Sequence, residues 1–238
     1  MLISMNDVSK VYPLGERTVA ALNGINLDID AGEFVVIKGQ SGSGKSTLLN
    51  LLSALDHSDS GHVKIKGVNI AELNESQRAR FRGEHIGIVF QSFNLIPVLT
   101  VLENVMYPLT LRGMNKAKAQ SLSLSALKDV GLDEFSGQRP NQLSGGQMQR
   151  VAIARAIVSK PDLVLADEPT ANLDSKTSST VIQLMHRLNQ DHGVTFIIAT
   201  HHDYVMKQAS RLITLEDGQI QQDTRIKLTS SNYQQAPL

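Results

Sequence analysis

Nine consecutive residues early in the chain form the pattern of a phosphate-binding loop. Gly39–Thr47 (GQSGSGKST) fits G-x-x-x-x-G-K-[ST], with an expected strand, Phe34–Ile37, before it and an expected helix, Ser46–Leu52, after it. In this setting backbone N–H groups turn inward around a polyphosphate, Lys45 reaches the terminal phosphates, and Ser46 supplies an oxygen to Mg²⁺. The predicted nucleotide-binding residues are Gly39, Gln40, Ser41, Gly42, Ser43, Gly44, Lys45, Ser46 and Thr47.

Two adjacent carboxylates provide the other groups that phosphoryl transfer requires. They follow the apolar run Leu163–Ala166, which predicts a buried strand ending at Asp167 and Glu168. Asp167 is suited to hold Mg²⁺ through its water shell, and Glu168 to polarise the water that attacks the γ-phosphate. An Asp-Glu pair after a strand is more often the start of a solvated loop, so this interpretation depends on the phosphate loop earlier in the chain.

A second glycine-containing turn precedes another predicted helix. In the sequence LSGGQ, Ser144 is a natural N-cap, and Gly145 and Gly146 expose backbone N–H groups in front of the positive end of the helix dipole. One chain would then carry two phosphate-binding surfaces. The simplest arrangement is a head-to-tail pair of subunits related by a two-fold axis, with each nucleotide between Lys45 of one subunit and Ser144 of the other.

With these motifs the chain resembles, over nearly its whole length, the ATPase subunit of an ATP-binding cassette (ABC) transporter. The LSGGQ segment is identical to the signature motif of that family, which implies nucleotide contacts from Ser144, Gly145, Gly146 and Gln147. The resemblance implies catalytic roles for Lys45, Glu168 and His201, the last as the switch histidine near the γ-phosphate. It also implies ATP and Mg²⁺ as cofactors, with Mg²⁺ held by Ser46, Gln91 and Asp167.

The resemblance gives roles to further residues that carry little signal alone, because a single Gln or Tyr on a loop is usually just solvated. Gln91 would also sense the membrane partner, Asn172–Asp174 would link the two sites across the dimer, and Tyr12 would stack on adenine. Their order and spacing around two specific motifs make coincidence an improbable explanation.

The chain departs from the family pattern beside the switch position. The family commonly has Asp directly after the histidine, whereas this chain has His202 there and Asp203 one place later. His201 keeps the switch role because it follows Thr200, at the end of a predicted strand, where a side chain can project over the site. We expect His202 to be a surface histidine.

Within the family, Ile86–Pro97 and Leu99–Val105 are similar to the bacterial branch that serves lipoprotein release, macrolide-type efflux and peptide-antibiotic resistance. The segment after Gln91 is too apolar for an ordinary solvent loop and can form a socket for a helix of a membrane protein. The alternative is that part of it packs inside the helical subdomain. The apolar residues concerned are Phe93, Leu95, Ile96, Val98 and Leu99.

Composition excludes several other classes of protein. The 238 residues include 23 basic and 23 acidic side chains, so zero net charge gives no general attraction to nucleic acid or an anionic membrane. The absence of cysteine excludes disulfides, cysteine-ligated zinc and thiol catalysis. No stretch approaches the roughly 18 continuous apolar residues of a membrane span, and the N-terminus lacks a secretion signal. The sequence therefore predicts a cytoplasmic protein, and the resemblance implies that it is peripheral on the inner face of the membrane through a separate permease.

The order of predicted elements indicates an α/β fold with an antiparallel β layer and an inserted helical subdomain, and the resemblance implies that the core is a P-loop NTPase (RecA-like) core. Residues 1–90 and 160–223 would form the core with its β layer, 91–159 the helical subdomain and 224–238 a polar tail. The predicted strands are Phe34–Ile37, Val63–Ile65, Ile86–Phe90, Leu163–Ala166 and Val194–Ala199. The predicted helices of the insertion are Val101–Leu111, Lys116–Val130 and Gly145–Ser159. The β layer is predicted from Leu2–Lys10, Ile25–Ile29 and the turn Glu216–Gln219.

These observations predict an ATP-hydrolysing subunit that dimerises around two ATP molecules, as a homodimer, and powers a separately encoded membrane permease. The expected transport is export, lipoprotein release or efflux of antimicrobial peptides or drugs. One alternative is a soluble cassette ATPase acting on nucleic acid or ribosomes. Such a protein usually shows two cassettes, a long coiled coil or a basic surface. A small-molecule kinase would leave the LSGGQ motif and Asn172–Asp174 without a role.

Overall fold

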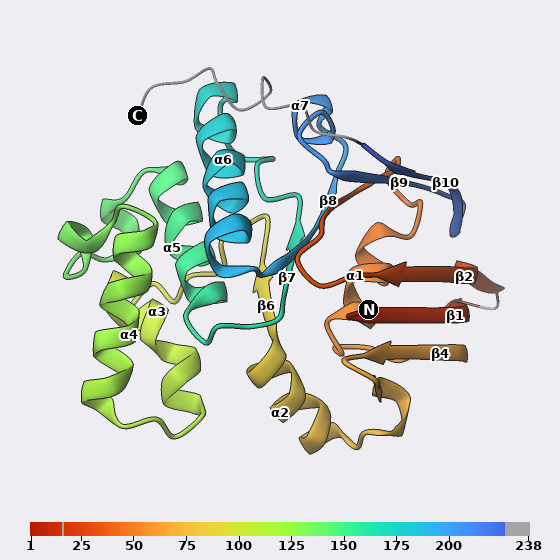
Figure 1. Cartoon of the computed structure of the whole chain (residues 1–238), viewed down its shortest axis with the longest axis horizontal. Coiled ribbons are helices and arrows are strands. Elements are labelled where there is room, and N and C mark those ends of the chain that lie inside the picture. Colours follow the sequence, from red (N-terminus) through yellow and green to blue (C-terminus); the bar gives the residue numbers. More distant parts are fainter. Residues whose placement is uncertain (16, 227–238) are drawn as a thin grey trace.

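A mixed sheet runs through the middle of the protein (Figure 1). In the computed structural model, which describes residues 1–15 and 17–226, this sheet has six strands in the order β10-β9-β3-β8-β7-β6. The first five strands in sequence are parallel to one another, and β10 pairs antiparallel with β9. The strands are β3 (Phe34–Lys38), β6 (Ile86–Val89), β7 (Leu163–Asp167), β8 (Thr195–Thr200), β9 (Arg211–Glu216) and β10 (Gln219–Arg225).

A smaller antiparallel sheet lies beside the first, in the order β2-β1-β4-β5. Its strands are β1 (Ile3–Leu14), β2 (Arg17–Ile29), β4 (Ser60–Ile65) and β5 (Val68–Asn69). Ile3 and Met5 of β1 are buried and Asn6 is exposed, since successive side chains of a strand point to opposite faces. This sheet is the antiparallel layer that the sequence predicts.

Helices cover both faces of the larger sheet. In Figure 1, α5 and α6 lie on one side of β6, β7 and β8, and α1 and the antiparallel sheet on the other. Asn74 with Gln77 and Thr100 with Glu103 form the capping boxes that begin α2 and α3. The α-helices are α1 (Lys45–Leu52), α2 (Glu75–His85), α3 (Val101–Leu111), α4 (Lys116–Asp129), α5 (Gly145–Ile157), α6 (Ser175–His192) and α7 (Asp203–Met206). Short 3₁₀ turns are η1 (Ile70–Glu72), η2 (Asp133–Phe135) and η3 (Pro140–Gln142).

Two hydrophobic cores form because the larger sheet is covered on both faces. Phe34 and Val36 of β3 belong to the core shared with α3, α4, α5 and α6. The intervening residues, Val35 and Ile37, belong to the core shared with α1 and the antiparallel sheet. A strand buried on both faces is apolar at every position, which explains the continuous apolar runs in the sequence. The sheet thus separates α1 from α5.

The observed elements confirm the predicted fold class and correct one part of it. The predicted turn Glu216–Gln219 is present, but it joins β9 to β10 at the edge of the larger sheet and does not belong to the antiparallel layer. The reason is that β9 pairs in parallel with β3, so the strand after the turn extends that same sheet. Helix α2 was not predicted.

Helix α5 connects the regions that the predicted boundaries separate. It packs against α3 and α4, and also against β6 and α6. A side chain at Gly87 in β6 would collide with the carbonyl oxygen of Ala156, so the C-terminal end of α5 lies directly on the strand. The boundaries at residues 90/91 and 159/160 remain a proposal. Strand β10 extends to Arg225, two residues into the predicted tail, and residues 227–238 of that tail lie outside the described residues.

Candidate active site

The phosphate loop joins the end of β3 to the start of α1 and depends on glycine for its shape. Gly44 has a φ of 102°, a left-handed conformation that L side chains rarely adopt, and a Cβ there would collide with the carbonyl oxygen of Ala21. A Cβ at Gly39 would collide with Ser43 Oγ and the carbonyl oxygen of Leu215. The compact turn therefore requires glycine at both positions.

The loop carries an ammonium group and a buried hydroxyl group. Lys45 Nζ donates hydrogen bonds to the carbonyl oxygens of Gly39, at 2.7 Å, and Gln40, at 2.9 Å. Ser43 Oγ is buried and has no hydrogen-bond partner among the described residues. A tight glycine-containing turn at a helix N-terminus that also carries an ammonium group fits the phosphate chain of a nucleotide.

Ser46 and Asp167 bring two oxygen donors together from different elements. Ser46 Oγ, in the first turn of α1, donates to Asp167 Oδ2 at the end of β7, at 3.0 Å. Burial raises the pKa of Asp167, the nearby charge of Glu168 raises it further, and the hydrogen bond from Ser46 opposes both. A partly desolvated carboxylate beside a hydroxyl is a donor set that fits Mg²⁺, a hard cation that prefers oxygen ligands.

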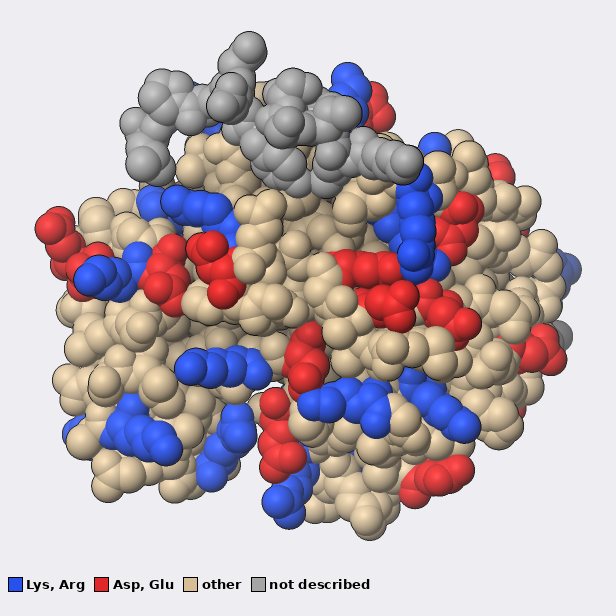
Figure 2. Space-filling view, in the orientation of Figure 1, with Lys and Arg blue, Asp and Glu red and all other residues tan. Residues whose placement is uncertain are grey.

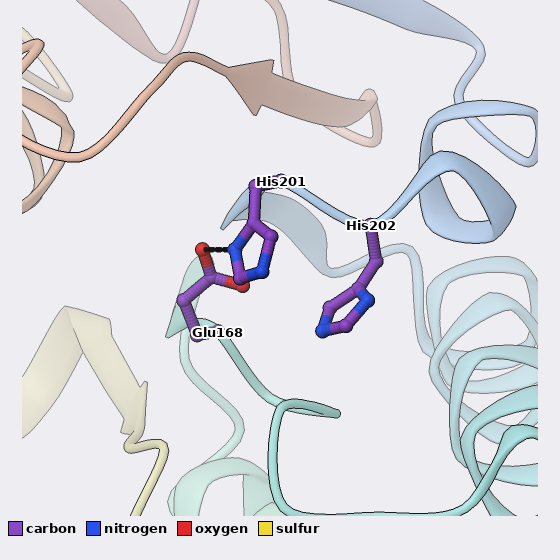
Figure 3. A group of neighbouring side chains, drawn as sticks. All are labelled: Glu168, His201 and His202. Carbon is purple, nitrogen blue, oxygen red and sulfur yellow. Dashed lines mark hydrogen bonds and ion pairs between the residues drawn. The ribbon is translucent and has the colours of Figure 1, made fainter.

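Glu168 is held at both of its carboxylate oxygens. Thr200 Oγ1 donates to Oε2 at 3.0 Å, and His201 Nδ1 donates to Oε1 at 2.6 Å (Figure 3). The backbone N–H of Glu168, a residue with φ of 45°, donates to the carbonyl oxygen of Ala199 at 2.9 Å. Because β7 and β8 are adjacent and parallel, their carboxyl ends place these groups at one edge of the sheet.

The LSGGQ segment begins α5 as predicted from its capping residue. The backbone N–H of Ser144 donates to Gln147 Oε1 at 2.8 Å, and Ser144 Oγ accepts from the backbone N–H of Gln147 at 3.3 Å. A Cβ at Gly146 would collide with the Thr177 methyl group, and one at Gly145 would lie 3.3 Å from Leu173 Cδ2. The two glycines therefore let the motif approach the segment that leads into α6.

Gln91 lies beside the same segment. Its backbone carbonyl oxygen accepts a hydrogen bond from Asn172 Nδ2 at 3.1 Å. Within the described part of the chain, Gln91 makes no hydrogen bond to Ser46 or Asp167. The structure therefore links Gln91 to the 172–174 loop through its backbone carbonyl group.

Tyr12 is fixed by an acid from another part of the chain. Its hydroxyl, near the end of β1, donates to Asp56 Oδ2 at 2.7 Å, and Lys10 Nζ donates to the other oxygen of Asp56 at 3.0 Å. Burial and the hydrogen bond with Asp56 raise the pKa of Tyr12, while Thr47 of the phosphate loop lies close enough to lower it slightly. The ring is thus held beside the loop.

Comparison with known proteins places the chain in a family. The family model described as ABC transporter matches residues 22–171. The chain belongs to the ABC transporter family. It is 44% identical over 230 residues to an uncharacterised ABC transporter ATP-binding protein, MJ0796, of Methanocaldococcus jannaschii, covering 95% of this chain and 98% of that protein. The predicted enzyme class, an ATPase cassette of this family, is confirmed.

A second relative of this cassette is much longer than the cassette itself. It is 45% identical to the macrolide export ATP-binding/permease protein of Syntrophobacter fumaroxidans, over 94% of this chain but only 32% of that protein. The chain thus spans about a third of the length of its macrolide export relatives. Among solved structures, a dimeric post-hydrolysis state of MJ0796 bound to ADP and Pi matches with a TM-score of 0.87 and 42% identity, covering 96% of this chain and all of that one.

Two residues of the cassette site carried no recognised signal in the sequence. Thr200 holds the Glu168 carboxylate, and Asp56 holds Tyr12. Each acts on a residue more than 30 positions away in the chain, so no local pattern marks it. The one signal for Thr200 was its place at the end of β8, the strand that follows β7 and its carboxylates in the sequence.

A groove with a volume of about 1030 Å³ opens on the cassette away from these residues. Figure 2 shows the surface hollowed between the lobe with α3 and α4 and the lobe with α2. Of the apolar residues predicted to form a socket, Ile96 lines the groove, whereas Leu95 packs against the helical core. Other apolar and basic residues lining the groove are Leu55, Ile88, Phe90, Tyr107, Leu111, Arg80, Arg82, Arg112 and Arg155.

Arg155 shapes the chain segment at the edge of this groove. Its guanidinium donates to the carbonyl oxygen of Phe93, at 2.8 Å, and to that of Asn94, at 2.5 Å. Phe93 and Asn94 both have positive φ angles, 60° and 48°. The guanidinium therefore holds a turn that sequence patterns did not predict, and this turn directs Phe93 away from the groove lining and toward Gly145.

Proposed function

We propose that this cassette binds Mg²⁺ and ATP, hydrolyses the ATP as a head-to-tail dimer, and thereby drives a membrane permease. The observation that carries the proposal is the position of Glu168, fixed at both oxygens next to the Ser46–Asp167 pair at the carboxyl edge of the sheet. Such a carboxylate is oriented before substrate arrives, as the positioning of an attacking water requires.

In this proposal the phosphates and Mg²⁺ are bound by different sets of residues. Lys45 and the backbone N–H groups of Gly39–Thr47 hold the phosphates, and Ser46, Asp167 and Gln91 hold Mg²⁺. When bound, Mg²⁺ neutralises negative charge on the phosphate oxygens. Glu168 orients the attacking water and accepts its proton.

His201 keeps the Glu168 carboxylate oriented through its hydrogen bond, and its ring extends toward the γ-phosphate. Tyr12 stacks on the base.

The arrangement of the two phosphate-binding surfaces supports the dimer. The loop that begins α1 and the turn that begins α5 belong to helices on opposite sides of the larger sheet. This placement favours contacts of the two surfaces with different nucleotides within one chain. A second copy turned by a two-fold axis would bring its Ser144, Gly145, Gly146 and Gln147 to the Lys45 side of the first. The similar cassette MJ0796, described as dimeric, supports the same assembly.

The groove between α2 and α3 supports docking of a permease. Three large apolar residues of the groove are well exposed: Leu55 (50%), Tyr107 (42%) and Leu111 (70%). The groove wall also carries four arginines and one glutamate, Glu84. A cytoplasmic helix with an apolar face and flanking acidic side chains would match this lining. Among the described residues, no helix is both long and apolar enough to cross a bilayer.

We propose export as the direction of transport, and a location at the inner face of the cell membrane. The macrolide export relatives support this choice. Zero net charge and the intermixed basic and acidic side chains on the face in Figure 2 favour it over a nucleic-acid or ribosome partner.

The test is the Glu168→Gln variant. Because Gln keeps the shape but cannot accept a proton, hydrolysis should fall to background while ATP binding persists and an ATP-dependent dimer accumulates. ATP turnover is measured alongside size-exclusion chromatography with and without ATP. Turnover near the wild-type rate would remove Glu168 from its proposed role.

A further inference from the structure

Three side chains at the ends of β7 and β8 form a cluster that the proposed hydrolysis uses only in part. Glu168, His201 and His202 each offer a ligand atom, and these atoms all lie within 4.8 Å of one another. The rings of His201 and His202 stack with their centroids 4.4 Å apart. Figure 3 shows His201 between Glu168 and His202. His202 has no task in the proposed hydrolysis, so its place in the cluster requires its own explanation.

We propose that Glu168, His201 and His202 bind a transition-metal dication of the Zn²⁺ class, and that this cation blocks ATP hydrolysis. Two imidazole nitrogens and one carboxylate oxygen are a ligand set that Zn²⁺ accepts, with a fourth position left for water. Mg²⁺ prefers octahedral oxygen ligands, so the same three groups discriminate against it. Neither Ser46 nor Asp167 belongs to this ligand set.

The geometry permits this coordination after a small adjustment. Zinc bonds of about 2.0–2.1 Å place neighbouring ligand atoms of a tetrahedral site about 3.3 Å apart. The side chain of His201 is 62% exposed, so its ring can rotate without disturbing the core.

Thr200 bonds to the other two residues of the cluster, to the side chain of Glu168 and to the backbone of His202. Its Oγ1 donates to Glu168 Oε2 and accepts from the backbone N–H of His202 at 3.1 Å. Such bonds from outside the ligand set hold metal ligands in place.

Inhibition follows if Glu168 acts as proposed above, and this half of the inference rests on that proposed function. A cation bound to Glu168 occupies the carboxylate that would orient the attacking water. The same cation binds His201 and so holds its ring away from the γ-phosphate. No residue of the phosphate loop belongs to the cluster. The cation should therefore reduce turnover while nucleotide affinity stays nearly constant.

Metal binding is tested directly by calorimetric titration of the full chain with ZnCl₂ in the absence of nucleotide. We expect one Zn²⁺ per chain. The His202→Asn variant should bind at least about tenfold more weakly, since even groups outside the ligand set contribute that much. His62→Asn, which removes an exposed histidine of β4 outside the cluster, is the matched control and should bind like the wild type. Unchanged binding by a folded His202→Asn chain, judged by its melting temperature, would overturn the site.

Hydrolysis is then measured with excess Mg²⁺ and buffered free Zn²⁺. Wild type and His62→Asn should be inhibited, and His202→Asn should hydrolyse ATP at the wild-type basal rate and resist Zn²⁺. Equal inhibition of all three chains would mean that Zn²⁺ acts elsewhere, for example by replacing Mg²⁺, and would overturn the inhibitory role. If Zn²⁺ binds through His202 but turnover is unaffected, the metal site stands and the proposed role of Glu168 fails.

Discussion

His201 Nδ1 donates to Glu168 Oε1 across 2.6 Å, and the two side chains differ sharply in environment. The histidine side chain is 62% exposed, whereas the glutamate side chain is 13% exposed. Thr200 occupies the second carboxylate oxygen. An exposed ring thus completes the orientation of a largely buried carboxylate, so the histidine can respond to what binds in front of the site while the acid stays in position.

This pairing predicts that His201→Ala impairs catalysis more than binding. Loss of a group that orients or stabilises the reacting atoms typically lowers kcat by about 10²-fold or more. The KM for ATP should change much less. His201→Gln should recover part of the loss, because an amide N–H can still donate to Glu168. Steady-state kinetics of both variants provides the measurement, and an unchanged kcat for His201→Ala would contradict the pairing.

Lys45→Ala should weaken ATP binding. Loss of a charge-assisted hydrogen bond of about 1.5–3 kcal/mol corresponds to a rise in Kd of roughly 10–100-fold. The melting temperature should also fall slightly, because Lys45 bonds to the carbonyl oxygens of Gly39 and Gln40. Calorimetric titration with ATP and Mg²⁺ measures the effect, with Lys64→Ala, an exposed lysine of β4, as control. Equal affinities of wild type and Lys45→Ala would count against the loop as the phosphate site.

Tyr12 and Asp56 permit a test of base stacking. Tyr12→Ala should weaken the binding free energy for ATP by about 1–3 kcal/mol, as for other aromatic side chains that stack on bases. The Kd should rise accordingly. Tyr12→Phe keeps the ring but loses the bond to Asp56, so its affinity should fall less. Affinity is measured by titration and folding by a thermal melt. If Tyr12→Ala lowers the melting temperature strongly and leaves the Kd unchanged, Tyr12 is a packing residue.

The parts of the fold and site that were predictable depend on short-range patterns. The phosphate loop, the N-cap Ser144 and the helix Val101–Leu111 each occupy a short stretch of sequence. Glycine geometry, capping and 3.6-residue periodicity act locally there. The continuous apolar run Phe34–Ile37 likewise marked a strand covered on both faces.

The remainder depends on contacts between distant segments. The turn Glu216–Gln219 shows that two strands pair, but only the parallel pairing of β9 with β3 decides to which sheet they belong. The bonds from Thr200 to Glu168 and from Tyr12 to Asp56 join residues 32 and 44 positions apart.

A mixture of two inactive variants tests the shared site. Lys45→Ala damages the phosphate loop, and Ser144→Arg places a bulky side chain at the second surface. If each nucleotide lies between two chains, the mixed dimer has one site with both lesions and one with neither. Mixing should therefore restore part of the ATP turnover, with each variant alone as control. A mixture that forms heterodimers but stays inactive argues against the arrangement.

Leu111 provides the sharpest test of permease docking. It is 70% exposed, it lines the groove, and Leu111→Asp would place a charge against the apolar face of a docked helix. Because an exposed position tolerates substitution, the variant should fold and bind ATP normally. Association with a candidate permease should weaken by about tenfold or more. Leu14→Asp is the matched control, since Leu14 is 68% exposed and lies outside the groove. Co-purification in detergent measures the association, and full retention of Leu111→Asp by the permease would place the docking surface elsewhere.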